Sequence, residues 1–222
     1  MEKIIYTSNY ENVKNGNRIS ISGDRGKGVN YEGKTLPILA PKKYFWQIWH
    51  NNIGKISEEE NTLFYVENYY NSVLSTIDPD TLLNMLSDRS VLLCYEDSTE
   101  FCHRHLVAYY LELFLGIETY EVKEKENYKL EIMPRPEYLK DILERVIKEN
   151  YNMHGFNSIK AAYLYQGANN LEEDIKEKYK DEYFDDYAGE MMTMACRLRM
   201  DADEEEQKYL LKNKEKIKKY TD

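Results

Sequence analysis

The chain of 222 residues lacks the features of several specialised classes of protein. It has three cysteines, none spaced as Cys-x-x-Cys, so we expect reduced thiols and no disulfide framework. No run approaches the roughly 18 consecutive apolar residues that a membrane span needs. The first residues also lack the apolar stretch of a signal peptide. These absences predict a cytoplasmic protein that makes no use of a membrane.

Positive charge is scarce as well, with 30 Lys and Arg residues against 40 Asp and Glu residues. Affinity for DNA and RNA comes mainly from basic side chains that displace counterions from phosphates. Extended nucleic acid is therefore not an expected partner, although a local basic site can still hold one nucleotide. What the chain does have is enough length and 42% hydrophobic residues to bury a full core. Its richness in Tyr, Lys, Asn and Ile fits an A+T-rich bacterial or phage genome.

Residues 1–122 alternate short apolar runs with amphipathic segments, which is typical of an α/β domain. The predicted strands are 3–7, 18–22, 90–95 and 117–122, and the predicted helices are 44–49, 57–77, 81–86 and 101–115. Ser57 and Glu60 have the spacing of a capping box at a helix N-terminus. The continuous apolar run at 90–95 is typical of a parallel strand covered on both faces. We therefore predict a parallel sheet in a Rossmann-like three-layer domain.

Residues 123–222 follow a different pattern and are predicted to form a mostly helical extension. A charged connection leads to an alternating segment at 128–132, which fits a hairpin strand. Apolar residues spaced three and four apart over 139–147 define an amphipathic helix. The remainder has helical character up to a lysine-rich end. The sequence thus places a division between residues 122 and 123.

Polar side chains follow three of the predicted strands, at the edge where open parallel sheets bind their ligands. The candidate site residues are Ser8 and Asn9 after the first strand, Asp24 and Arg25 after the second, Glu96 after the third, and Cys102, His103 and Arg104 in the opening turn of the next helix. We predict that one pocket gathers these residues. The alternative is that they only cap helices and fill polar loops.

Cys102 is the strongest candidate for chemistry in this set. The first turn of a helix presents unpaired N–H groups and the positive end of the helix dipole, and both favour a thiolate. His103 and Arg104 add positive charge beside it, so the turn suits either a nucleophile or an anion-binding site. The alternative is an inert buried thiol on the apolar stripe of the helix.

The remaining candidates receive roles from the same chemistry. Glu96 and Asp24 are candidate general acids or bases, or ligands of a ribose hydroxyl. The expected ligand contacts come from Ser8, Asn9, Arg25, His103 and Arg104, and the arginines hold the anion. The glycine-rich stretch 23–28 resembles a phosphate cradle without the Walker spacing. No cofactor is assigned and no metal is predicted, because His103 and His105 lie roughly 200° apart around a helix and cannot converge with Cys94 and Cys102.

Several segments together resemble the family catalogued as domain of unknown function 488. They are 91–96 (VLLCYE) and 101–108 (FCHRHLVA) and, earlier and in the same order, 5–8 (IYTS), 19–22 (ISIS) and 39–41 (LAP). The resemblance covers residues 3–122 and departs from the pattern at 23–25. It implies an α/β fold with the Cys-His-Arg turn as the site, and it implies no particular reaction.

The sequence predicts a protein that binds a small anionic ligand, such as a nucleotide or a nucleotide-derived metabolite. It leaves open whether the protein also converts that ligand. The alternative is a non-enzymatic interaction protein whose acidic, helical C-terminal half binds a partner protein.

Overall fold

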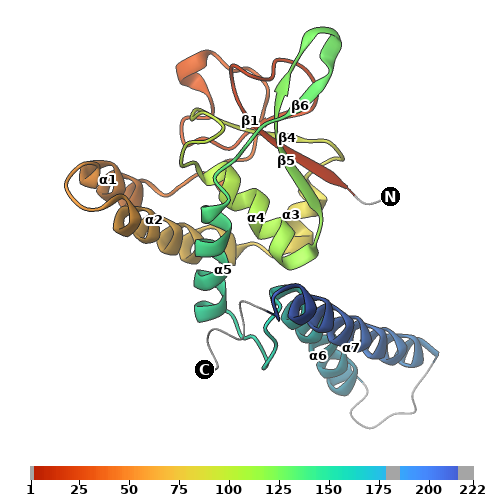
Figure 1. Ribbon diagram of the computed structural model, residues 1–222. Helices are drawn as coiled ribbons and strands as arrows, with labels where there is room; N and C mark the ends of the chain where they lie inside the picture. The colour runs from red at the N-terminus through yellow and green to blue at the C-terminus, as the bar shows by residue number, and fades with distance from the viewer. Residues whose placement is uncertain (1–2, 179–185, 215–222) are drawn as a thin grey trace. The chain divides into compact units, whose positions relative to one another are not determined.

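The computed structural model describes residues 3–178 and 186–214, and the chain divides between Glu149 and Asn150 into two compact units. The first unit holds a six-stranded sheet in the order β3-β2-β4-β1-β5-β6 (Figure 1). Its strands are β1 (Ile4–Asn9), β2 (Arg18–Ser20), β3 (Lys34–Thr35), β4 (Val91–Cys94), β5 (Glu118–Glu124) and β6 (Leu130–Ile132). The first five pair in parallel, and β6 pairs antiparallel with β5. The predicted α/β class and mostly parallel sheet are confirmed.

The two faces of the sheet differ in what covers them, because side chains alternate along each strand. Val91 and Leu93 belong to a buried apolar cluster that also contains Val122. Tyr10 and Val13 also belong to this cluster, and the partly buried Tyr31 packs against it. Helix α4 (His103–Leu115) contacts β1, β4 and β5 instead. The strand at 91–94 is therefore buried along its whole length, as the apolar run predicts.

The helices of the first unit begin where the local sequence favours it. They are α1 (Lys43–Asn52), α2 (Glu58–Ser72), α3 (Pro79–Met85), α4 and α5 (Tyr138–Asn150), the last of which reaches the boundary between the units. The predicted capping box is present, since the Glu60 N–H donates to Ser57 Oγ and the Ser57 N–H donates to Glu60 Oε2. Helix α4 ends at Gly116, whose φ of 70° lies in the left-handed region that glycine adopts at little cost.

An aromatic cluster fixes α1 and α2 beside the beginning of α4. Phe45 of α1 is fully buried against Tyr65 and Tyr69 of α2. The Tyr69 hydroxyl donates to the Leu39 carbonyl at 2.6 Å. Tyr65 also packs edge-on against Phe101, which precedes α4, with their ring centroids 4.8 Å apart. This packing places the two helices next to the carboxyl end of β4.

The predicted and observed divisions of the chain differ. The sequence places the boundary at 122/123, whereas β5 runs through that point and β6 continues the same sheet. Helix α5 also belongs largely to the first unit, where Lys140 pairs with Glu112 of α4 at 2.5 Å. Strand pairing thus holds residues 130–132 to the sheet, and an ion pair joins α5 to α4.

The second unit is helical, and its main elements are α6 (Ile159–Lys178) and α7 (Asp186–Lys212). The two helices pack against each other, as Figure 1 shows. Alanines seven residues apart are fully buried on each helix: Ala161 and Ala168 on α6, and Ala188, Ala195 and Ala202 on α7. Side chains this small allow close helix packing. No helix in the described parts of the chain is both long and apolar enough to cross a membrane.

Candidate functional site

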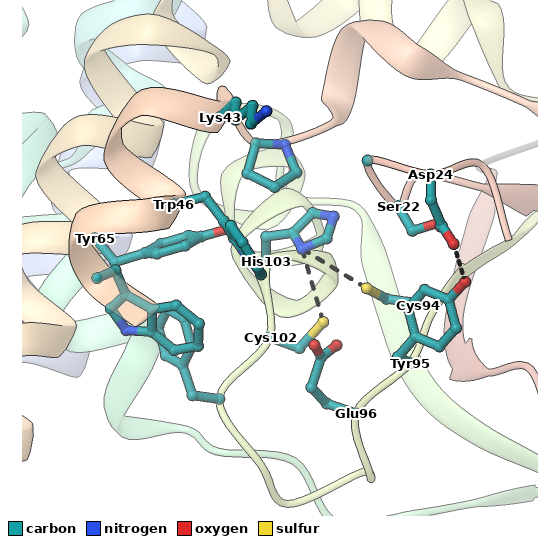
Figure 2. Close-up of a pocket in the computed structure, with 14 residues that line it drawn as sticks. Ser22, Asp24, Lys43, Trp46, Tyr65, Cys94, Tyr95, Glu96, Cys102 and His103 are labelled. Carbon is teal, nitrogen blue, oxygen red and sulfur yellow. Dashed lines mark hydrogen bonds between the residues drawn. The ribbon is translucent and has the colours of Figure 1, made fainter. Parts of the chain in front are cut away.

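A cavity of about 440 Å³ opens beyond the carboxyl ends of β2 and β4 (Figure 2). Three parts of the chain form it: the loop after β2, helices α1 and α2, and the segment from β4 to the first turn of α4. The volume falls within the range of small-molecule sites. Its position is the one at which open parallel sheets bind ligands.

One wall of the cavity is aromatic. It is made by Trp46 and Trp49 of α1, Tyr65 of α2 and Phe101 before α4, whereas Tyr95 lies on the opposite side beside Asp24 (Figure 2). Trp49 and Phe101 lie 5.4 Å apart between ring centroids. Trp46 is 40% exposed, so its ring is accessible from solvent. Aromatic faces of this kind stack on planar rings.

The floor of the cavity holds two thiols and an imidazole. His103 Nε2 lies 3.0 Å from the Ile21 carbonyl oxygen, which can only accept, so Nε2 carries a proton. His103 Nδ1 therefore faces the sulfurs, at 3.8 Å from Cys94 Sγ and 3.9 Å from Cys102 Sγ (Figure 2). All three side chains are buried.

The surroundings of the two thiols separate their pKa values. Burial raises the pKa of Cys102, but a hydrogen bond from Cys94 and the charges of Arg104 and His103 outweigh it and hold the pKa well below its usual range. Burial and the neighbouring Cys102 raise the pKa of Cys94. Burial lowers the pKa of His103, but the charge of Cys102 outweighs it and raises that pKa. The floor thus favours a thiolate at Cys102, the N-cap residue of α4.

Glu96 lies beside Cys102 (Figure 2), and its side chain is 38% exposed. Partial burial and the charge of Cys102 raise the pKa of Glu96 to about 7. Its Oε2 is enclosed and has no hydrogen-bond partner among the described residues. The same holds for Arg104 Nη1, which lies 3.9 Å from that oxygen. Buried polar atoms are nearly always hydrogen-bonded, so this pair fits a place for a ligand atom or a water molecule.

Asp24 organises the loop after β2. Its Oδ1 accepts from Ser22 Oγ at 2.8 Å and from the Gly26 N–H at 2.9 Å. Its Oδ2 accepts from the Gly28 N–H at 3.0 Å and from the Tyr95 hydroxyl at 2.5 Å. These hydrogen bonds outweigh burial and lower the pKa of Asp24 to about 2. The carboxylate thus occupies two N–H groups that a phosphate cradle would need.

The structure brings four of the eight predicted residues to the cavity: Asp24, Glu96, Cys102 and His103. Ser8 is fully buried, and its hydroxyl donates to the Val122 carbonyl at 2.6 Å. Asn9 donates to Asp97 at 3.0 Å and accepts from the turn that follows β1. Arg25 is exposed in the glycine-rich loop and is not among the lining residues.

Arg104 lies behind the cavity floor, fully buried in an ionic cluster around Glu121 of β5. Its Nε and Nη2 donate to Glu121 at 3.2 and 3.1 Å, and Nη2 also donates to the Asp97 carbonyl. Glu121 further accepts from Thr7 Oγ1 at 2.6 Å and lies 3.2 Å from His105 Nε2. Most of the guanidinium N–H groups are therefore used in hydrogen bonds within the protein, and only Nη1 remains for a ligand.

Three potential metal ligands meet at the floor. The sulfurs of Cys94 and Cys102 and a ring nitrogen of His103 all lie within 4.8 Å of one another. His103 and His105 diverge, as the helix geometry predicts, because His105 is turned to Glu121. The divergence of the two histidines excludes only a metal site made by both of them together with Cys94 and Cys102. Without His105, the other three side chains fit a soft metal ion.

Sequence reasoning missed the aromatic wall and Lys43, which also lines the cavity. The density of aromatic residues over 44–49 is visible in the sequence. No local pattern, however, shows that this helix folds over the strand ends. The packing of Phe45 on Tyr65 and Tyr69, which places it there, joins residues far apart in the chain.

A family model described as the active DUF488-N3 subclade matches residues 3–113, half of the chain. This span contains every residue that lines the cavity. No curated protein matches the chain, and neither does any solved structure.

Proposed function

This chain belongs to the DUF488 family, and we propose that it binds and converts a small anionic ligand with a planar ring, such as a nucleotide or a nucleotide-derived metabolite. The observation that carries the proposal is one cavity with an aromatic wall and a polar floor. We interpret the fold as Rossmann-like, because the cavity lies beyond parallel strands β2 and β4, where that architecture binds ligands.

The lining of the cavity suits the two parts of such a ligand. Trp46 and Trp49 offer ring faces for a base, with Tyr95 on the side of β4. Lys43, in the first turn of α1, offers a charge for a phosphate or carboxylate. No carboxylate among the described residues forms an ion pair with Lys43, so its ammonium group can turn to a ligand.

Conversion is supported by the polar groups of the floor. Glu96 Oε2 is enclosed without a partner and lies beside Cys102, so a proton can pass between this carboxyl and a bound ligand. The matching subclade is itself described as active. These observations favour an enzyme over a protein that only binds.

Native mass spectrometry tests the binding directly. The protein is incubated with nucleoside mono- and diphosphates, the corresponding nucleosides and inorganic phosphate. We expect a saturable one-to-one adduct with at least one nucleotide and a weaker one with its nucleoside. Absence of a saturable adduct with any ring-bearing anion would contradict the proposal.

Lys43→Ala provides a matched test of the anion contact, with the neighbouring exposed Lys42→Ala as control. We expect Lys43→Ala to weaken nucleotide binding by about two- to fivefold, the range for an exposed ion pair, and to leave nucleoside binding unchanged. Lys42 does not line the cavity, so its variant is expected to bind as the wild type does. Equal losses in both variants would remove Lys43 from the site.

A second candidate function rests on α7, where Met194, Met200 and Leu211 are 55%, 72% and 74% exposed. Flexible apolar side chains of this kind suit contacts with a partner protein. The same native spectra separate the two functions, since a second chain adds a mass far larger than a nucleotide. This candidate would be favoured if a partner protein co-purifies with the chain and also binds a variant whose cavity is blocked.

A further inference from the structure

We propose that Cys94, Cys102 and His103 bind a zinc ion at the floor of the cavity. Thiolate sulfur and imidazole nitrogen are the donors that zinc prefers, and two cysteines with one histidine make an established kind of zinc site. Each of the three side chains lines the cavity. The inference concerns the metal alone and holds whether or not a nucleotide is the ligand.

The separations between the donor atoms fit a single ion. Tetrahedral zinc with bonds of about 2.3 Å to sulfur and about 2.0–2.1 Å to nitrogen keeps those donors roughly 3.6 Å apart. The distances from His103 Nδ1 to the two sulfurs are 3.8 and 3.9 Å. A contraction of a few tenths of an ångström brings His103 Nδ1 to bonding geometry with each sulfur, and the two sulfurs lie within 4.8 Å of each other.

The histidine is already oriented as a metal ligand. Its Nε2 donates to the Ile21 carbonyl at 3.0 Å, which fixes the tautomer and points Nδ1 at the sulfurs. Metal-binding histidines almost always use their second nitrogen in this way. The ring is also held by Tyr69, which packs edge-on with its centroid 5.6 Å away.

The backbone positions of the ligands are equally well fixed. Cys94 is the last residue of β4, at the centre of the sheet, and it pairs in register with Asn9. Cys102 is the N-cap of α4 and His103 is the first residue of that helix. The three ligands thus come from one strand end and one helix start, both packed in the core.

The charges at the floor also balance around a divalent ion. Two thiolates neutralise Zn²⁺, while the Glu96 carboxylate and the Arg104 guanidinium lie beside them as an opposite pair. Zinc binding displaces the thiol protons, as it does wherever cysteine becomes a ligand. The buried sulfurs then carry their charge next to a cation.

Three protein ligands leave one position of a tetrahedral ion free, and catalytic zinc sites keep such a position for water or substrate. Glu96 lies beside Cys102 and stays outside the converging set of donors. In this arrangement Cys102 would serve as a ligand, and the ion would supply Lewis-acid chemistry at its open position.

Metal content and cobalt spectra test the proposal. The full chain is purified under reducing conditions, stripped, and reconstituted with Zn²⁺ or Co²⁺. We expect about one tightly bound zinc per chain by mass spectrometry of the metal, and a thiolate-to-cobalt charge-transfer band with the intense visible bands of tetrahedral Co²⁺. Cys94→Ser, Cys102→Ser and His103→Ala should each lower zinc affinity at least 100-fold, more than the loss of an outer partner does.

Cys196→Ser is the matched control, because Cys196 is the third free cysteine and is exposed on α7. It should keep one zinc and the same cobalt spectrum as the wild type. The wild-type cobalt spectrum tests the proposal even if a variant of Cys94, Cys102 or His103 fails to fold. Wild-type protein without a thiolate-to-cobalt band after reconstitution would overturn the inference, and so would loss of zinc from Cys196→Ser alone. A nucleotide adduct without zinc would leave the proposed function intact, so the two failures are distinguishable.

Discussion

At the scale of single residues, the two arginines predicted to hold an anion turn out to have different surroundings. Arg104 is fully buried and bonded to Glu121 and to a backbone carbonyl, whereas Arg25 is exposed in a loop. Removing one partner of a buried ion pair leaves the other charge uncompensated. The side chain of Arg104 therefore supports the floor that carries Cys102.

This difference predicts different stabilities for two alanine variants. Arg104→Ala should lower the free energy of unfolding by about 3–5 kcal/mol, because Glu121 then stays buried without its main partner. Arg25→Ala should stay within about 0.5 kcal/mol of the wild type, as surface substitutions usually do. Urea unfolding followed by circular dichroism measures both. Similar small losses in the two variants would show that the ionic cluster does not hold the floor.

At the scale of elements, a polar clamp joins α4, β5 and the start of α5. Glu112 of α4 accepts from Lys140 of α5, from Thr119 of β5 at 2.5 Å and from Arg135 at 2.7 Å. Burial raises the pKa of Glu112, but the hydrogen bonds from Lys140 and Thr119 and the charge of Arg135 outweigh it and lower the pKa. The clamp stabilises the fold only while Glu112 is ionised.

The pH dependence follows from the sign of that shift. A carboxyl with a lowered pKa in the folded state contributes stability that is complete above its unfolded value, about 4.3, and is lost as pH falls through the folded value. The difference in unfolding free energy between wild type and Glu112→Gln should therefore be largest near neutral pH and shrink as pH falls below about 4.3. Denaturant unfolding over that range measures it. A difference that grows on acidification would contradict the clamp.

Some of these elements can be predicted from the sequence and others cannot. β4 and α4 were predictable because a continuous apolar run, a polar turn and a terminal glycine are local signals. β3 was not, since it is two exposed residues, Lys34–Thr35, without an apolar pattern. It forms a strand because it pairs with β2, and the residues of β3 themselves carry no pattern that predicts this pairing.

At the scale of the whole molecule, the floor of the cavity was predictable and its wall was not. Cys102, His103 and Glu96 stand at a strand end and a helix start, and the sequence marks both. Trp46 and Trp49 reach the cavity only through the packing of α1 and α2 on distant residues. The burial of Arg104 likewise depends on Glu121, which lies on a later strand.

The central claim is that a planar, anionic ligand binds in this cavity, and intrinsic fluorescence tests it most directly. The chain has two tryptophans, Trp46 and Trp49, and both line the cavity. All tryptophan emission therefore reports on the site. Titration with the nucleotide that gives the strongest adduct should change the emission saturably, with the same midpoint as adduct formation, while inorganic phosphate alone leaves it unchanged. Saturable nucleotide binding with no change in tryptophan emission would place the ligand elsewhere and contradict the account.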